Sequence, residues 1–275
     1  MAEPGAATSF SLDAYLARIG YAGPTRPTAD LLDAIQQAQL SAIPFENFDI
    51  LLGRGVSLDP DTLCRKLLHS RRGGYCFELN ALFLMALEAL GFDARALLAR
   101  VHMRGEPSGR THQLILVTVD GTPWIADTGF GGPGLRAPIP LERNVARAQR
   151  GERYRLVDAG PFGTMLQRHM DGAWRDLYSF DLGHVGPADI ALGNHFTSTH
   201  AGSFFTFSRV AARQTPGGRL ALLDRTLRRV EHGVETVEEL PDGPALLETL
   251  EAVFGIVLDA PYEALRPLPD STSGI

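Results

Sequence analysis

The stretch Arg71-Arg72-Gly73-Gly74-Tyr75-Cys76-Phe77-Glu78-Leu79-Asn80 places a cysteine between a glycine turn and a helix-forming sequence. The two glycines permit a tight turn, and residues 77–90 show an unbroken helical pattern that ends at Gly91. Cys76 is therefore expected in the first turn of a helix, where free backbone N–H groups and the helix dipole favour a thiolate. A free cysteine at a helix start can also be a small buried hydrophobe. The nucleophilic interpretation needs a base elsewhere in the chain.

Composition indicates a globular protein of one large domain or two to three smaller ones. The chain has 275 residues, 44% of them hydrophobic, and a formal net charge of −6. Lys66 is its single lysine, and no basic surface for nucleic acid or an anionic membrane is expected. The two cysteines, Cys64 and Cys76, show neither a disulfide framework nor a zinc pattern. Residues 1–5 lack the features of a signal peptide, so a cytoplasmic location is expected.

The first third of the chain is expected to form a small helical bundle. Apolar residues recur at helical spacing after Ser11, after Thr28 and after Asp59-Pro60, which are typical helix starts. Cys64 shares the apolar face of the third helix and is interpreted as structural. Residues 43–49, which include Pro44 and Phe45, are too short and proline-marked for a helix interior. By itself this segment reads as a packed connector with its phenylalanines in the core.

A hairpin in the middle of the chain supplies a candidate base. Residues 94–102, 111–119 and 124–127 read as strands, and the last two are joined at Asp120-Gly121. A four-residue loop would place His112 directly opposite Asp127, whereas a two-residue turn would place them diagonally. In both registers they share a face, and a carboxylate beside a histidine can orient it and stabilise its imidazolium. Such pairs also occur for stability alone, but with Cys76 this one would complete a nucleophile–base–acid triad.

The remainder of the chain reads as strands followed by a final helix. Residues 128–134 form a glycine-rich loop that would let backbone approach a ligand, without a nucleotide-binding fingerprint. Alternating segments after residue 150 predict a small barrel or sandwich. Residues 193–200 read as a polar connector, and His195 and His200 lack accompanying ligands, so no metal is expected. Strands are expected over 219–237, a helix over 244–254 and a disordered tail over 270–275.

Several of these motifs together resemble the arylamine N-acetyltransferases. The specific ones are Arg72–Asn80, Thr111-His112-Gln113-Leu114 and Asp127-Thr128-Gly129-Phe130-Gly131. Further matches are Pro44-Phe45-Glu46-Asn47, Ser198-Thr199-His200 ahead of Ser203-Phe204-Phe205, and Gln214-Thr215-Pro216. The likeness runs along most of the chain. Thr128 stands where valine is more usual, a departure that concerns local packing.

The resemblance implies an α+β fold of three domains with a cysteine-protease-like triad core. These would be a helical bundle over residues 1–90 carrying the nucleophile, a β-barrel over 91–195 carrying the histidine and aspartate, and an α/β lid over 196–275. It assigns catalysis to Cys76, His112 and Asp127. It further implies two binding sets: Phe45, Phe130 and Phe204 around the acceptor, and Gly109, Gly131, Gly132 and Thr215 at coenzyme A.

The activity that the resemblance implies is N-acetylation of aromatic amines and hydrazines by acetyl-CoA, through an acetyl-cysteine and a ping-pong scheme. No metal, nucleic acid or membrane partner is implied, and xenobiotic metabolism in the cytoplasm is the expected setting. Three alternatives remain open at this point. They are an amide synthase or macrolactam-forming acyltransferase of the same fold, a cysteine hydrolase, and a non-enzymatic ligand-binding protein.

Overall fold

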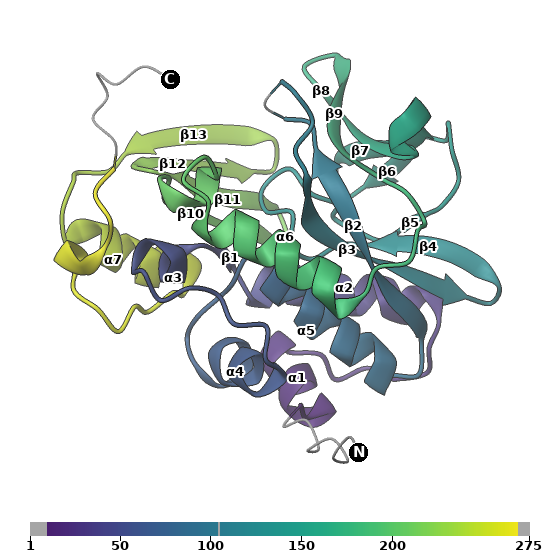
Figure 1. The fold of residues 1–275 in the computed structure, drawn as a ribbon, viewed down its shortest axis with the longest axis horizontal. Coiled ribbons are helices and arrows are strands. Elements are labelled where there is room, and N and C mark those ends of the chain that lie inside the picture. The colour runs from purple at the N-terminus through teal and green to yellow at the C-terminus, as the bar shows by residue number, and fades with distance from the viewer. Residues whose placement is uncertain (1–9, 104, 269–275) are drawn as a thin grey trace.

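The protein combines an N-terminal group of helices with two antiparallel sheets (Figure 1). The computed structural model describes residues 10–103 and 105–268. The segments behind the signal-peptide and disordered-tail predictions, 1–5 and 270–275, lie outside the described residues. The α-helices are α1 (Leu12–Ile19), α2 (Ala29–Ala42), α3 (Phe48–Leu51), α4 (Pro60–Cys64), α5 (Cys76–Ala89), α6 (Pro187–Thr199) and α7 (Ala245–Thr249). Single π-helical turns, Arg65–His69 and Leu250–Phe254, extend α4 and α7, and 3-10 turns lie at Gly160–Phe162, Phe204–Thr206 and Tyr262–Ala264.

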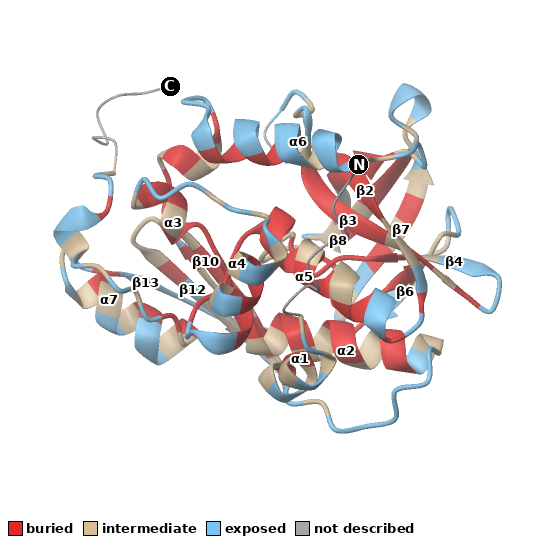
Figure 2. Cartoon of the chain, turned by 60° about the horizontal axis from the view of Figure 1, so that its bottom comes forward, coloured by how far each residue is buried: buried red, intermediate tan, exposed pale blue. Residues whose placement is uncertain are grey.

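The N-terminal helices start where local sequence predicts. Ser11, Thr28 and Asp59 each accept a backbone N–H of the first turn and thereby cap α1, α2 and α4. The apolar faces of these helices pack around α5, whose residues are largely buried (Figure 2). Helix α5, which begins at Cys76, is thus the central element of the bundle, and its position is fixed on several sides by apolar packing.

Eight strands form a nearly closed antiparallel barrel. The strands are β2 (Asp93–Val101), β3 (Arg110–Val119), β4 (Thr122–Ala126), β5 (Ile139–Pro140), β6 (Arg147–Gln149), β7 (Glu152–Asp158), β8 (Thr164–Met170) and β9 (Ala173–Phe180). Their spatial order is β5-β4-β3-β2-β9-β8-β7-β6. The barrel interior is filled by apolar side chains of alternate strand positions.

The hairpin of β3 and β4 adopts the second of the two predicted registers. Val119 pairs with Thr122 and Ile115 with Ala126. The turn is the pair Asp120-Gly121, both at positive φ of 49° and 76°, as a two-residue I′ turn requires. Asp127 therefore follows the end of β4 and lies diagonal to His112, not directly opposite it.

A second sheet covers the other side of the bundle and includes a piece of the N-terminal segment. Its order is β1 (Phe45–Glu46), β10 (Val210–Thr215), β11 (Gly218–Leu223), β12 (Thr226–Glu231) and β13 (Val234–Glu239). β1 pairs with β10 and also bridges to Gly74, next to the nucleophile. The first 90 residues thus contribute a strand to the C-terminal sheet. The boundaries 1–90, 91–195 and 196–275 stay predictions.

Helix α6 corrects one sequence-based expectation. The connector predicted over residues 193–200 is wrong, because helix runs to Thr199. Pro187 in the first turn and a reciprocal cap between Gly186 and Asp189 start the helix. Polar residues inside it are satisfied locally: Thr197 Oγ1 donates to the Gly193 carbonyl at 2.7 Å. Figure 2 shows the outer face of α6 exposed. Within the two described ranges, no helix has the length and apolar character needed to cross a membrane.

Candidate active site

Cys76 begins α5, and the backbone around it is closely packed. The Tyr75 N–H before the helix donates to Glu78 Oε2 at 3.0 Å, which caps the first turn. Gly129 lies directly against Cys76: a Cβ there would stand 2.7 Å from both Cys76 Cα and Asn80 Nδ2. Only glycine fits this contact. The glycine-rich loop and the start of α5 are thus locked together at the cysteine.

His112 and Asp127 form a buried pair at the end of the hairpin. His112 Nε2 lies 2.8 Å from Asp127 Oδ2, and both side chains are almost fully buried. Asp127 Oδ1 accepts from Asn80 Nδ2 at 3.0 Å and from the Gly129 N–H at 2.8 Å. Burial alone would raise the pKa of Asp127, but His112 and these donors hold it below its ordinary value. The carboxylate is therefore charged at neutral pH, and Nε2 must carry the proton that it accepts.

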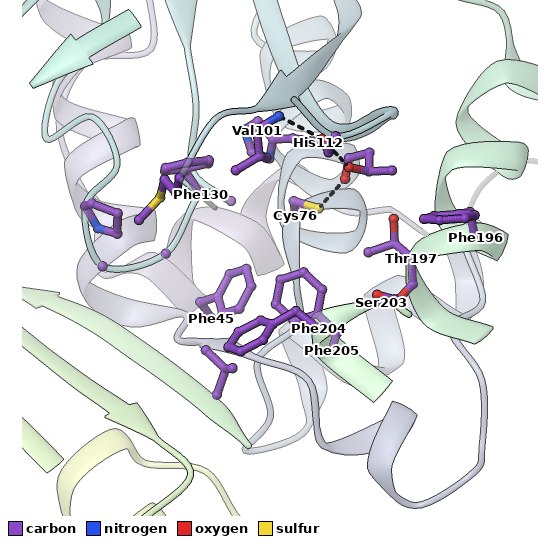
Figure 3. A pocket seen from close by; sticks show the side chains of 18 of the residues that line it. Phe45, Cys76, Val101, His112, Phe130, Phe196, Thr197, Ser203, Phe204 and Phe205 are labelled. Atoms are coloured by element: carbon purple, nitrogen blue, oxygen red, sulfur yellow. Dashed lines mark hydrogen bonds between the residues drawn. The ribbon is translucent and has the colours of Figure 1, made fainter. Parts of the chain in front are cut away.

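Cys76 and His112 line the same cavity (Figure 3). The thiol lies 3.8 Å from the Thr111 carbonyl oxygen, in the residue that precedes His112. Because Nε2 faces Asp127, Nδ1 is the ring nitrogen that this carboxylate does not engage. Three residues that are distant in the sequence are thus gathered at one end of α5.

Burial and the backbone N–H groups act in opposite directions on the pKa of the Cys76 thiol. Burial raises the pKa of the Cys76 thiol to about 12, and the carboxylates of Asp127 and Glu78 add to the rise. Hydrogen bonds from the backbone N–H groups of Gln113 and Phe77 oppose it without overcoming it. The N–H groups at the helix start thus favour the thiolate as expected, but the effect of burial on the thiol pKa is larger. A positive charge beside the sulfur would favour the thiolate, and the His112 side chain lines the same cavity.

The cavity has a volume of about 380 Å³ and a mainly aromatic wall. All three predicted acceptor residues, Phe45, Phe130 and Phe204, line it. The Phe130 ring stands edge-on to the His112 ring, with centroids 4.9 Å apart. Of the four predicted coenzyme residues, Gly131 and Gly132 line the cavity, whereas Gly109 and Thr215 lie outside its lining. The structure thus gathers five of the seven predicted binding residues in one place.

Sequence reasoning missed part of this wall. Phe205 and Phe207 line the cavity and sit in the same short aromatic run as Phe204, so that run was the available signal. Phe196 also lines it, but it lies on α6, which was taken for a connector. Tyr178 packs behind His112 at a centroid distance of 5.0 Å, and no local pattern marks that strand residue as special.

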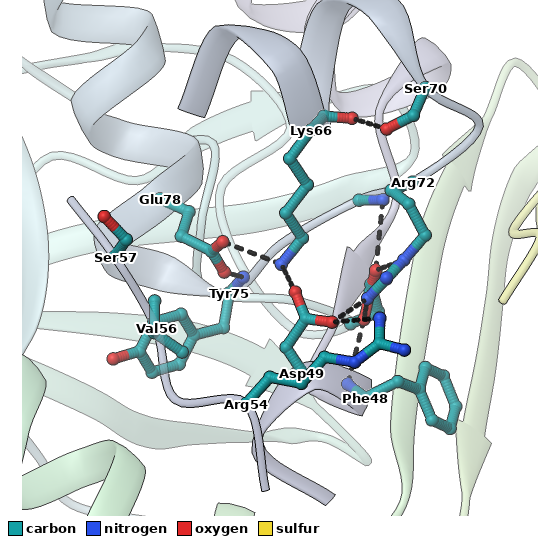
Figure 4. Close-up of polar contacts among 12 residues, drawn as sticks. Phe48, Asp49, Arg54, Val56, Ser57, Lys66, Ser70, Arg72, Tyr75 and Glu78 are labelled. Atoms are coloured by element: carbon teal, nitrogen blue, oxygen red, sulfur yellow. Dashed lines mark hydrogen bonds and ion pairs between the residues drawn. The ribbon is translucent and has the colours of Figure 1, made fainter. Parts of the chain in front are cut away.

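Buried charges hold the turn that leads into Cys76 (Figure 4). Arg72 Nε lies 2.7 Å from Glu46 Oε1 and Arg72 Nη2 lies 2.9 Å from Asp49 Oδ1. Lys66 Nζ bridges Asp49 at 2.6 Å and Glu78 at 2.7 Å. Glu78 is the same carboxylate that caps the Tyr75 N–H. This network therefore ties β1, α3 and α4 to the first turn of α5.

Within this network, burial and the charge of the partner act in opposite directions on each pKa. Burial alone would lower the pKa of Lys66, but the carboxylates of Glu78, Glu46 and Asp49 raise it above its ordinary value. Lys66 is thus protonated at neutral pH and cannot act as a nucleophile. Burial raises the pKa of Glu78, while the Lys66 charge opposes that rise.

The described residues contain no group of three or more histidine, cysteine or acidic side chains that could hold a metal ion. The His200 ring stacks on Phe196 at 4.4 Å between centroids. His200 Nδ1 accepts the Gly202 N–H at 3.1 Å. These contacts account for His200 without a ligand role.

Comparison with known proteins fits this geometry. Residues 28–262 match a family described as N-acetyltransferase. The chain is 41% identical over 254 residues to an arylamine N-acetyltransferase / N-hydroxyarylamine O-acetyltransferase of Salmonella typhimurium, with 90% of this chain and 89% of the relative covered. The chain belongs to the arylamine N-acetyltransferase family.

Solved arylamine N-acetyltransferases share the whole fold. The Salmonella typhimurium structure superposes with a TM-score of 0.85 at 38% identity, covering 89% of this chain and 90% of that one. The Mycobacterium marinum arylamine N-acetyltransferase in complex with CoA gives a TM-score of 0.85 at 37% identity, covering 90% and 93%. The predicted fold class, an α+β arylamine N-acetyltransferase fold with helical bundle, barrel and lid, is confirmed.

Proposed function

We propose that this chain transfers an acetyl group from acetyl-CoA to arylamines and arylhydrazines by a ping-pong mechanism through acetyl-Cys76. The observation that carries the proposal is the arrangement of Cys76 and His112 on one aromatic cavity, with Asp127 bonded to the far side of the imidazole. Family membership supports the acyl-transfer class, and the coenzyme A complex of the Mycobacterium marinum relative supports the donor.

In the first half-reaction, Cys76 Sγ attacks the thioester carbonyl carbon while the thiol proton passes to His112 Nδ1. The raised thiol pKa makes this transfer obligatory, since few thiolates would form without the imidazolium. The oxyanion needs donors, of which the Cys76 backbone N–H at the start of α5 is the first candidate. The bond from carbon to coenzyme sulfur then breaks, and the coenzyme thiolate takes the proton from His112.

In the second half-reaction, the amine nitrogen attacks the acetyl carbon and gives a proton to His112. The bond to Cys76 Sγ breaks, and the thiolate recovers that proton. Water must be kept away from the acetyl-cysteine meanwhile. Phe45 and Phe205, with ring centroids 5.8 Å apart, and Phe130 provide a dry surface on which a flat aromatic amine can stack.

The coenzyme contacts form a finer part of the proposal. Gly131 and Gly132 are at the cavity wall, where the absence of a side chain leaves room for the pantetheine arm. Gly109 and Thr215 lie off that wall and would have to meet the outer part of the coenzyme. Among the described residues both cysteines are buried and not disulfide-bonded, as in a reducing compartment. Cytoplasmic acetylation of foreign aromatic amines is the setting that we infer.

Intact-protein mass spectrometry tests the route. The chain is incubated with acetyl-CoA without an amine, beside a Cys76→Ser variant. One acetyl adduct is expected on the native chain, none on the variant, and discharge when an arylamine is added. The single lysine, Lys66, is buried in ion pairs and should not contribute an adduct. An adduct that persists in the variant, or turnover of the donor in water alone, would overturn the proposal and favour a different acceptor or a hydrolase.

A further inference from the structure

Behind Asp127 lies a set of buried polar side chains that the proposed chemistry does not use. Asn80, Thr128, Gln39 and Tyr15 are each at most 3% exposed. They come from α5, from the loop after β4, from α2 and from α1. Unpaired polar groups in such a place would be strongly destabilising. Their hydrogen bonds therefore show which interactions this part of the core must keep.

Asn80 uses every hydrogen-bonding position of its amide. Its Nδ2 donates to the Gln113 carbonyl at 2.6 Å and to Asp127 Oδ1 at 3.0 Å. Its Oδ1 accepts from the Thr128 N–H at 2.9 Å and lies 3.2 Å from Thr128 Oγ1. A carboxamide offers two N–H donors and two acceptor lone pairs. The orientation that points the NH₂ group at Asp127 is therefore the one that satisfies all four.

Thr128 links this amide to the helical bundle. Its Oγ1 accepts from Gln39 Nε2 at 3.0 Å, and Gln39 Oε1 accepts from the Tyr15 hydroxyl at 2.8 Å. The Thr128 hydroxyl proton has two possible acceptors, Asn80 Oδ1 at 3.2 Å and the Leu79 carbonyl at 3.3 Å. The Leu79 carbonyl oxygen already accepts two hydrogen bonds, one from Gln39 Nε2 at 2.9 Å and one from an N–H of its own helix. The proton thus goes to Asn80, and the donors run in one direction from Tyr15 to Asp127.

The end of this chain of donors is the carboxylate that orients the base. Asn80 and the Gly129 N–H hold Oδ1, which leaves Oδ2 for His112. Rotating the carboxylate away from His112 would break both Oδ1 bonds in a site without solvent. The donors also contribute to the lowered pKa of Asp127.

We propose that Asn80 and Thr128 are positioning residues, which fix the Asp127 carboxylate and through it the proton-accepting state of His112. The proposal rests on the triad proposed above. Neither residue lines the cavity that holds Cys76 and His112, so neither is expected to alter acceptor binding. Their effect should appear in how readily the thiol loses its proton to the imidazole.

The test compares the native chain with Thr128→Val, Thr128→Ser and Asn80→Leu. Valine keeps the shape and the backbone N–H but removes the hydroxyl, whereas serine keeps the hydroxyl. The first readout is the rate at which iodoacetamide alkylates Cys76 between pH 5 and 10, which needs neither acetyl-CoA nor an amine. The second is the rate of acetyl-enzyme formation, with KM for the amine. The alkylation rates would therefore still test the positioning role if the proposed acetyl transfer proved wrong.

For Asn80→Leu we expect about 10²-fold slower acylation, the scale of a misplaced catalytic group, an unchanged amine KM and a higher alkylation midpoint pH. Thr128→Val should slow alkylation at pH 7 about fivefold, as for one lost neutral hydrogen bond, while Thr128→Ser stays close to native. Thr164→Val is the matched control: this buried threonine accepts Arg143 Nη2 at 2.8 Å on β8, and its loss should leave the profile unchanged. A native profile in Thr128→Val, or a lower rate in Asn80→Leu without a shifted midpoint, overturns the proposal. If Asn80→Leu does not fold, the valine and serine pair decides alone.

Discussion

Replacing His112 by glutamine separates the two influences that act on the Cys76 thiol. Burial raises the pKa of that thiol to about 12, and in our scheme only the proton-accepting imidazole makes a thiolate accessible near neutral pH. Glutamine fills similar space and can hydrogen bond to Asp127, but it cannot take up the proton. The variant therefore exposes the intrinsic acidity of the buried cysteine.

The expected magnitude follows from the pKa. At pH 7.5 a thiol with a pKa of about 12 is ionised to roughly 3 × 10⁻⁵, compared with about 10% for an ordinary exposed cysteine. Alkylation of Cys76 in His112→Gln should then be at least about 10³-fold slower than in the native chain at that pH. Because this pH range lies below the pKa of the thiol, the thiolate fraction grows about tenfold per pH unit. The alkylation rate should therefore rise about tenfold per pH unit up to pH 10.

The assay is iodoacetamide labelling followed by peptide mass spectrometry, which separates Cys76 from the buried Cys64. His169→Gln serves as the control, because that histidine lies on β8 against Trp174 and is not part of the cavity wall. Circular dichroism confirms that each variant is folded before labelling. Labelling of His112→Gln within tenfold of native at pH 7.5, or a midpoint below about pH 9, would refute the reasoning that burial dominates the thiol.

Three other predictions follow from single contacts. Gly129→Ala places a Cβ 2.7 Å from Cys76 Cα, so the rate of acetyl transfer should fall by about 10²-fold or more. A variant as active as the native chain would show that the glycine-rich loop can move away from Cys76 without loss of function. Among the described residues of the cavity lining, Glu106 is the one carboxylate, and none is a lysine or arginine. We therefore expect 4-aminobenzoate to be acetylated less efficiently than its methyl ester, and Glu106→Gln to reduce the difference between the two rates in a salt-dependent way. An unchanged difference between the two rates would contradict this role of Glu106. Lys66→Met leaves the Glu78 carboxylate without its partner and should lower the free energy of unfolding by about 3 kcal/mol in urea titrations. Since the folded-state pKa of Lys66 is raised, its charge contributes fully to the free energy of unfolding below about pH 10, and this contribution declines as the pH increases further. Equal urea midpoints for the variant and the native chain at pH 7 would show that the Lys66 charge does not stabilise the fold.

Local signals were sufficient for the helix starts and for the hairpin. Ser11, Thr28 and Asp59 satisfy N–H groups within their own first turns, so three or four residues contain the whole interaction. The same holds for Asp120-Gly121, whose turn type depends on two residues. The register stayed open in the sequence because both loops keep His112 and Asp127 on one face. The pairing of Ile115 with Ala126 decided it.

The prediction for residues 193–200 was wrong because local sequence does not show how helix α6 is packed. The polar residues of this segment are typical of a solvent-exposed connector. In the fold, Gly193 lies against Phe77, where a Cβ would come within 2.8 Å of that ring. Thr197 and Ser198 return their hydroxyls to carbonyls of the same helix. Such close contact between distant segments is not encoded in any local pattern.

By itself, the sequence predicted Cys76 as a candidate nucleophile at a helix start, with His112 and Asp127 as its candidate partners, and it identified the family, because motif spacing and backbone chemistry are local properties. Only the tertiary structure gave the burial that raises the pKa of the Cys76 thiol, the size and aromatic wall of the cavity, and the donors to Asp127. Those properties depend on desolvation and on contacts between segments far apart in the sequence, such as Gln39 with Thr128 and Phe45 with Phe205. Burial raises the pKa of the Cys76 thiol by more than the N–H groups at the helix start lower it.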